Sequence, residues 1–437
     1  MKTTRNIAPP SPQFSTSVAF SGYLRSVPKT SNSAAVGEFS IPRFQRDLPR
    51  LLWIGDAMVP TGFATVTHSL LDHLWKDWNV LVSGINSTES FEMPHYSVVP
   101  AQRKEDMWGI DSFEDLCSEF EPDLVVINND WWNVAKFLEC EVDVPVVAYM
   151  PVDGANMDPG DVSVLNRLAA AVWYTDFGWQ EAQSAGYTGE RHVVPHGSAL
   201  PEESSVSRGE ARKLLGLEIP DSAFLVGNVN RNQPRKRIDL TLDYFASWIH
   251  EHHVDDAWLC LHCSHSEDGW DLRRLAEYHG ISDRVVFTDG DGTIGSVPEE
   301  TLDLIYRSFD LQVSTTSGEG WGLTTMEGMS RGIPQIVPDW AALGEWTKGG
   351  VECIPCGTRL AHPMINTIGA LPDREPFVAA LDRFYRDPAS RSSSGRDAKR
   401  CVSGKRFRWE SVAREFDGIL RRVSARERDS LSLRRAS

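Results

Sequence analysis

Long apolar runs are missing from this chain of 437 residues. No stretch approaches the roughly 18 consecutive apolar residues that a transmembrane helix needs, and the N-terminus has no continuous apolar signal core. The sequence therefore predicts a cytoplasmic protein without a transmembrane segment, with an organelle transit peptide as the lesser alternative. A hydrophobic content of 41% and a charged content of 24% are typical of a soluble globular protein, and the length allows two domains.

Basic residues outnumber acidic residues at both ends of the chain. Residues 1–46 hold six Lys or Arg and one acid, and residues 386–437 hold fifteen and seven. The two ends thus carry charges of +5 and +8. Since the net charge of the whole chain is −17, the residues between them carry −30. We expect a flexible basic extension at 1–46 and a disordered basic tail at 426–437. The acidic body argues against sequence-independent nucleic-acid binding, but the basic ends leave a nucleic-acid partner open.

The number of cysteines is odd, which does not suggest a disulfide framework. There are seven, and the context is not evidently secretory, so reduced thiols are predicted. Two pairs have the CxxC spacing of zinc ligands, Cys260 with Cys263 and Cys353 with Cys356. The apolar stretches 258–263 and 351–354 look like strands, where residues three apart point to opposite faces, so each pair would be badly placed to bind a metal. Buried thiols are therefore favoured over a metal site.

A GxGxxG motif is also missing, so a nicotinamide dinucleotide is not indicated, but the chain does alternate strands with helices. The first series of predicted strands covers 51–54, 79–85, 123–128, 144–150, 171–174 and 191–194, with helices such as 64–75, 112–120 and 161–169 between them. The second series has strands at 224–229, 258–261, 285–287, 311–313 and 335–337. This α/β pattern predicts Rossmann-like domains at 47–200 and 201–408, followed by an amphipathic helix at 409–425.

One glycine-rich turn is the best candidate for a ligand site. It lies between an apolar strand and a predicted helix at 323–331 and reads Ser317-Gly318-Glu319-Gly320-Trp321-Gly322. Such a turn forms an anion site, because the first N–H groups of the helix have no internal partners. Two carboxylates, Glu319 and Glu327, flank the site. Carboxylates beside phosphates are reasonable where they accept hydrogen bonds from hydroxyls, which points to a sugar.

Other loops that follow predicted strands would meet the same ligand, because ligands of doubly wound sheets bind at the carboxyl ends of the strands. Gly62 and Phe63 form one such loop, in which the glycine allows a close approach or is an ordinary turn residue. The 228–237 loop places four cations in seven positions. Arg231 with Lys236 would neutralise a diphosphate, unless the loop is simply solvated.

Further candidates lie in the first half of the chain. His196 is either a ligand contact or a satisfied turn residue, and Asp153 follows a predicted strand nearby. Trp131 and Trp132 could stack on an acceptor ring, but aromatic residues beside a strand end more often belong to the core.

Together these motifs resemble glycosyltransferase family 4, the retaining enzymes with the GT-B fold. The resemblance covers roughly residues 48 to 425. It rests on two glutamates separated by seven residues, an Arg and a Lys five apart, an inter-domain signature, a first glycine loop and the entry to a final helix: Glu319 and Glu327, Arg231 and Lys236, Pro195-His196-Gly197, Gly62, and Phe407-Arg408-Trp409-Glu410.

The resemblance implies two Rossmann-like domains that face a cleft, with the last helix crossing back to the first domain. It implies a UDP- or GDP-sugar as co-substrate and a hydroxyl acceptor, and it requires neither a metal nor another cofactor. Arg231 and Lys236 would stabilise the diphosphate leaving group, and Glu319 would hold the donor sugar. Glu327 would accept from the ribose hydroxyls. The amides near sugar and phosphate would be those of Gly320, Trp321, Gly322 and Leu323.

One position departs from the family pattern. Many members have a histidine that contacts the donor sugar where this chain has Asp153, so the identity of the sugar stays open. The acceptor is open as well, and a small metabolite, a lipid or polysaccharide, a protein and a modified DNA base all remain. The alternative function is a catalytically silent GT-B protein that binds a nucleotide sugar.

Overall fold

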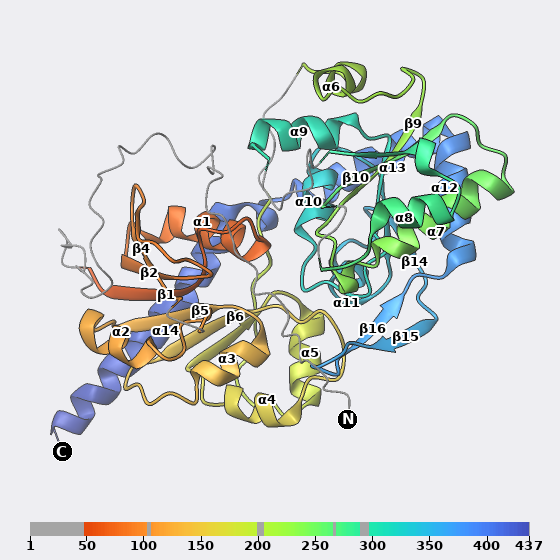
Figure 1. The fold of residues 1–437 in the computed structure, drawn as a ribbon. Helices are drawn as coiled ribbons and strands as arrows, with labels where there is room; N and C mark the ends of the chain where they lie inside the picture. The colour runs from red at the N-terminus through yellow and green to blue at the C-terminus, as the bar shows by residue number, and fades with distance from the viewer. Residues whose placement is uncertain (1–47, 103–105, 199–204, 265–267, 289–296, 437) are drawn as a thin grey trace, which may run out of the picture.

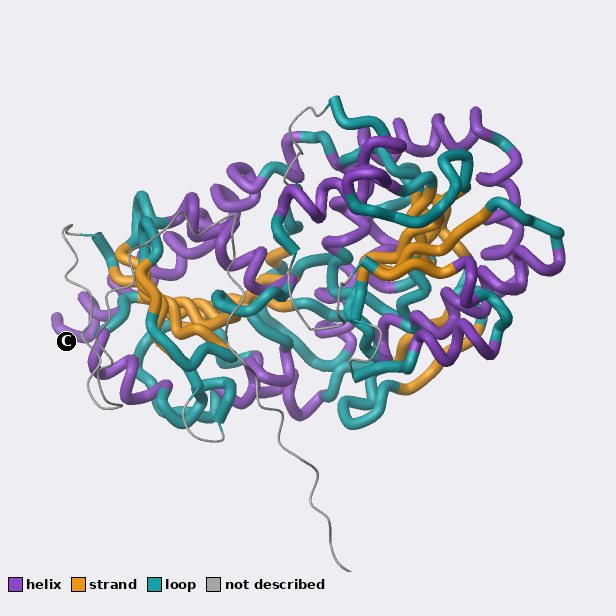
Figure 2. Tube along the Cα trace, turned by 45° about the horizontal axis from the view of Figure 1, so that its top comes forward, coloured by secondary structure: helices purple, strands orange, loops and turns teal. Residues whose placement is uncertain are grey.

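Two mainly parallel β-sheets, each covered by helices on both faces, form the two halves of the molecule (Figure 1). The computed structural model describes residues 48–102, 106–198, 205–264, 268–288 and 297–436. The predicted flexible extension at 1–46 lies outside these residues. Figure 2 shows the two sheets side by side, with helices and loops around each.

The first half contains an eight-stranded sheet in the order β3-β4-β2-β1-β5-β6-β7-β8. Its strands pair in parallel except β3 with β4. The strands are β1 (Arg50–Asp56), β2 (Asn79–Ile85), β3 (Phe91–Glu92), β4 (Ser97–Pro100), β5 (Leu124–Asn128), β6 (Val146–Met150), β7 (Ala170–Trp173) and β8 (His192–Val193). The helices are α1 (Gly62–Leu74), α2 (Phe113–Phe120), α3 (Trp131–Phe137), α4 (Pro159–Leu165) and α5 (Asp176–Ser184).

The second half contains a six-stranded parallel sheet in the order β11-β10-β9-β12-β13-β14 and a separate antiparallel hairpin, β15-β16. The strands are β9 (Phe224–Val229), β10 (Ala257–His262), β11 (Val285–Phe287), β12 (Leu311–Val313), β13 (Gln335–Pro338), β14 (Glu352–Ile354), β15 (Thr358–Ala361) and β16 (Ile368–Leu371). The helices are α6 (Arg208–Leu214), α7 (Ile238–Glu251), α8 (Leu272–Tyr278), α9 (Glu299–Ser308), α10 (Leu323–Ser330), α11 (Ala341–Trp346), α12 (Arg374–Arg386), α13 (Pro388–Val402) and α14 (Trp409–Ala436). Three short 3-10 turns are η1 (Pro234–Lys236), η2 (Ser282–Arg284) and η3 (Lys405–Phe407).

Strand β1 shows why the apolar runs of the sequence become central strands. Leu51 and Trp53 lie in one core cluster, and Leu52 and Ile54 lie in another on the opposite face. Neighbouring side chains of a strand point to opposite faces, so a strand covered by helices on both sides must be apolar at every position. The predicted α/β class with two doubly wound sheets is therefore confirmed.

Helix α14 crosses from the second half back to the first, as expected, and ends beyond the first sheet (Figure 1). Phe416 packs against Trp53 and Tyr149, with ring centroids 6.1 and 5.1 Å apart. The prediction that the helix ends at residue 425 and that a disordered tail follows was wrong, because α14 continues to Ala436. The extension is favoured by the absence of glycine and proline after Gly418 and by the many arginines and leucines.

The first CxxC pair lies on opposite faces of the second sheet, as expected, whereas Cys356 of the second pair lies beyond the end of β14. Cys260 belongs to a core cluster on one face of the second sheet, and Cys263 belongs to a cluster on the other face. Burial raises the pKa of Cys260 to about 12. Cys353 and Cys356 are half-buried, and none of the seven cysteines, all of which the structure describes, forms a disulfide. Within the described part of the chain, no helix combines the length and the apolar character of a membrane span.

Candidate active site

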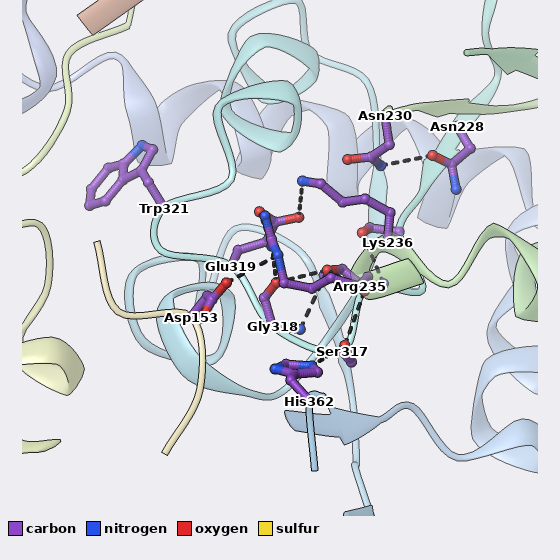
Figure 3. A network of polar contacts seen from close by, with 12 residues as sticks. Asp153, Asn228, Asn230, Arg235, Lys236, Ser317, Gly318, Glu319, Trp321 and His362 are labelled. Carbon is purple, nitrogen blue, oxygen red and sulfur yellow. Dashed lines mark hydrogen bonds and ion pairs between the residues drawn. The ribbon is translucent and has the colours of Figure 1, made fainter. Parts of the chain in front are cut away.

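The 317–322 loop connects β12 to α10 and lies directly against the 151–153 loop of the first half (Figure 3). A Cβ on Gly318 would overlap the carbonyl oxygen of Asp153, and a Cβ on Gly320 would overlap Pro151. Gly322 begins α10 with a φ of 94°, a backbone conformation that favours glycine. The glycines thus let the two halves approach to backbone contact at the N-terminus of α10.

Glu319 lies at the centre of a network of charges. One carboxylate oxygen, Oε1, is 2.6 Å from Nζ of Lys236, and the other, Oε2, is 3.0 Å from Nη1 of Arg235. Burial alone would raise the pKa of Glu319, but the charges and hydrogen bonds of Lys236 and Arg235 outweigh it and lower the pKa to about 2. Glu319 is 7% exposed, and its carboxylate stays ionised at neutral pH, because each of its oxygens has a cationic partner.

Arg235 also reaches the other half of the molecule. Its Nε is 3.0 Å from Oδ2 of Asp153, and its Nη1 donates to the carbonyl oxygen of Gly318 as well as to Glu319. The sequence prediction missed Arg235, because the Arg and Lys spacing of the family drew attention to Arg231 and Lys236. The high density of cations in this loop pointed to a charged site, but it did not show which of the cations would contact Glu319.

Lys236 and Arg231, the two residues predicted to bind the diphosphate, lie in different surroundings. Lys236 ends η1 and points at Glu319, whereas Arg231 is exposed after the end of β9. Burial raises the pKa of Asp56, and the nearby charge of Arg231 partly opposes this rise. Asp56 ends β1, so Arg231 extends from the second half toward the first.

Glu327 lies on α10 and has other partners than Glu319. Its Oε2 accepts a hydrogen bond of 2.6 Å from the hydroxyl of Tyr306, a residue of α9. Burial raises the pKa of Glu327, although the Tyr306 hydrogen bond and the charge of Arg331 oppose it. The two glutamates therefore have different partners and opposite pKa shifts, as two groups with different tasks would.

Three aspartates lie at the carboxyl ends of β1, β5 and β6, on the side of the first half that faces these groups. Burial raises the pKa of Asp130 to about 7, and the charges of Asp153 and Asp56 add to the rise, while Arg235 opposes it. Gly62 lies beside them at the start of α1, where an added Cβ would be 3.3 Å from Cδ1 of Leu323 on α10. The carboxyl ends of both sheets therefore face one another.

His196 and Trp321 are core residues of the junction between the halves. His196 is 2% exposed, and neither ring nitrogen has a hydrogen-bond partner within the described residues. Its ring packs on those of Tyr149, Tyr174 and Trp321, and burial lowers its pKa to about 3. The Trp321 indole stacks on Trp346 at 4.8 Å, away from the charged network in Figure 3. Only the backbone of Trp321 can therefore face a ligand beside Glu319.

The aromatic residues considered for acceptor stacking are largely committed to packing. Trp131 is 3% exposed and lies in the core of the first half, at the start of α3. Trp132 is half-buried, 6.0 Å from Trp108, with Nζ of Lys136 5.1 Å from its ring centre. Phe63 packs against the core under α1. The sequence allowed either stacking on an acceptor or packing in the core for the tryptophans, and these contacts favour packing.

Two doubly wound sheets with facing carboxyl ends and a helix that crosses back define the GT-B fold. A family model described as glycosyl transferases group 1 matches residues 221–373, which contain Arg231, Lys236 and both glutamates. The chain has the same fold as sucrose-phosphate synthase from Thermosynechococcus elongatus, with a TM-score of 0.68 and 18% identity, over 86% of this chain and 99% of that one.

Curated relatives agree with this relationship. The chain is 25% identical over 338 residues to a D-inositol 3-phosphate glycosyltransferase of Acidothermus cellulolyticus, covering 71% of this chain and 70% of the relative. It is 29% identical over 195 residues to the lipopolysaccharide core biosynthesis mannosyltransferase LpsB of Rhizobium meliloti, covering 43% of this chain. This second alignment spans 52%, about half, of the relative's length. The chain thus has the GT-B fold and is related in sequence to glycosyltransferases.

Proposed function

We propose that this protein is a retaining glycosyltransferase that moves a sugar from a nucleoside-diphosphate sugar to a hydroxyl acceptor. The observation that carries the proposal is the ionised Glu319 between Lys236 and Arg235, at the N-terminus of α10 and opposite the carboxyl end of the first sheet. A buried carboxylate with two cations beside the N-terminus of a helix can hold sugar hydroxyls and a diphosphate at once.

In the proposed reaction, the bond between the anomeric carbon and the diphosphate oxygen breaks, and a bond from the acceptor oxygen to that carbon forms on the same face. The leaving phosphate takes the acceptor proton, so neither a protein base nor a metal is needed. Lys236 and Arg231 stabilise the charge that develops on the diphosphate. Because Arg235 also neutralises Glu319, Lys236 can turn from the carboxylate to the phosphate without leaving a buried charge unpaired.

Glu319 accepts hydrogen bonds from the donor sugar, and Glu327 accepts from the ribose. Asp153 extends toward the same site from the first half and takes the place of the family's histidine. For the acceptor, the aspartates at the ends of β1, β5 and β6 favour a neutral hydroxyl compound over a polyanion such as nucleic acid. Steep salt dependence of acceptor binding would instead support a nucleic acid.

A donor panel tests this function. UDP-, GDP- and ADP-sugars are incubated with the protein, with and without mixed hydroxyl acceptors, and the released nucleoside diphosphate is measured. We expect slow release from one donor class without acceptor and faster release with one. Lys236→Met should abolish the release, whereas Lys348→Met, at a side chain that is 63% exposed, should not. Tight nucleotide binding without any release would identify the catalytically silent alternative, and neither binding nor release would reject both.

A further inference from the structure

The β15-β16 hairpin joins the two halves through the main chain. The amide of Ala155 donates to the carbonyl of Ile368 at 2.9 Å, and the amide of Ile368 donates to the carbonyl of Ala155 at 2.8 Å. Nδ2 of Asn156 also donates to the carbonyl of Asn366 at 3.0 Å. Ala155 belongs to the first half and follows Asp153 by two residues, so this bridge forms beside the ion pair between Asp153 and Arg235.

The same hairpin is fastened to the loop that carries Glu319. The amide of Ala370 donates to the carbonyl of Ser317 at 2.9 Å, and the Ser317 hydroxyl is 2.9 Å from Nε2 of His362. Ser317 in turn donates its amide to the carbonyl of Arg235 at 2.9 Å. The hairpin, the glycine loop and η1 therefore form one connected unit on the second half. Its contacts on the first half include Asp153 and Ala155.

Arg235 is the side chain that links this contact to the site. Its guanidinium is planar and presents its N–H groups in a fixed fork, so the Nε contact with Asp153 also sets where Nη1 points. Nη1 holds Glu319 and the carbonyl of Gly318. If the halves separated, Asp153 would leave, the guanidinium would be free to rotate, and Lys236 would be the remaining cation that fixes the Glu319 carboxylate.

We propose that Arg235 is a positioning residue that makes the placement of Glu319 depend on closure of the two halves. In the closed molecule both Arg235 and Lys236 contact Glu319, so Lys236 can turn to the diphosphate of a bound donor while Arg235 still holds the carboxylate. In an open molecule Lys236 stays with Glu319, and the donor is not cleaved while water can enter. The role of Glu319 in this inference rests on the proposed function, but the closure contact itself does not.

Hydrogen exchange of the bridging amides tests the contact without any substrate. Arg235→Met and Asp153→Asn should each speed exchange at Ala155 and Ile368 by about tenfold or more, the scale for losing a charge-assisted hydrogen bond. Arg237→Met is the matched control. It removes a cation from the same loop, but that cation pairs with Asp239 within the second half. Unchanged exchange in both test variants, or equal acceleration in the control, would overturn the proposal.

A local role of Arg235 inside the second half would give a different pattern. In that case Arg235→Met would speed exchange and Asp153→Asn would not, which also contradicts the proposal. Amides of the core helix α7 should exchange as in the wild type in every variant, because these variants are expected to open the contact and not to unfold the half.

Activity then tests the coupling to Glu319. Arg235→Met should lower kcat by about tenfold to a hundredfold, and the Kd for the nucleoside diphosphate should rise as well, because Lys236 is then held by Glu319 and meets the diphosphate less readily. The share of donor lost to water should rise relative to transfer. Arg235→Lys should not restore the ratio, since one ammonium cannot keep the fork geometry. If the wild-type protein transferred no sugar, the proposed function would be rejected. The hydrogen-exchange result on the closure contact would still hold.

Discussion

Replacing Glu319 by glutamine tests the electrostatic core of the site. The substitution keeps the size and the hydrogen-bonding oxygen of the side chain but removes the negative charge between Lys236 and Arg235. Two part-buried cations, with side chains 30% and 15% exposed, then lie together without the carboxylate that both of them contact. We therefore expect a loss of folding stability, in addition to a loss of activity.

The pKa of Glu319 gives the size of the effect. A fall from 4.5 to about 2 corresponds to about 3 kcal/mol in favour of the ionised carboxylate, at 1.36 kcal/mol per pH unit; the pKa of Lys236 is lowered as well, because its burial outweighs the attraction of Glu319, so the carboxylate is the member of the pair that gains from it. Because the folded-state pKa is lowered, this stability is fully present above pH 4.5 and is lost as the pH falls toward 2. The difference between variant and wild type should thus be the same at pH 7 and pH 5.5 and shrink in stronger acid.

Urea unfolding, followed by the fluorescence of the fifteen tryptophans, measures this difference. We expect Glu319→Gln to lower the free energy of unfolding by about 3 kcal/mol at both pH values. Glu277→Gln, at an exposed position of α8, is the control and should change it by less than about 0.5 kcal/mol. A loss below about 1 kcal/mol for Glu319→Gln would show that Lys236 and Arg235 do not stabilise the carboxylate, and would refute the reasoning.

Three further predictions concern the proposed reaction. Lys236→Met should lower turnover by about 10² to 10³, measured as released nucleoside diphosphate, and near-normal turnover would remove Lys236 from the transition state. Glu327→Gln should weaken nucleoside-diphosphate binding by about tenfold in calorimetry, because an acceptor for the ribose hydroxyls loses its charge, and an unchanged Kd would reject that role. Gly320→Ala should lower turnover and speed exchange at the hairpin bridge, because its Cβ would overlap Pro151; a fully active variant would contradict the tight approach of the loops.

Much of the site could be predicted from the sequence because its signals are local. The apolar strand, the glycine turn and the helix at 323–331 follow from neighbouring residues, and α10 does span Leu323–Ser330. The spacing of Glu319 and Glu327 likewise needs no knowledge of distant residues. The elements that the sequence did not predict include α3 at Trp131–Phe137 and the β15-β16 hairpin. They are short, so the periodicity of their apolar residues cannot be told from that of a loop.

By itself, then, the sequence determined the alternating α/β architecture and the strand, turn and helix around Glu319, because hydrophobic period and glycine chemistry act over a few residues. The tertiary structure decided which side chains meet. It chose Arg235 from among adjacent cations, paired it with Asp153 from the other half, and buried His196 and Trp321 in the junction. Such choices depend on how η1 orients its side chains and how two distant loops pack, which no local pattern encodes.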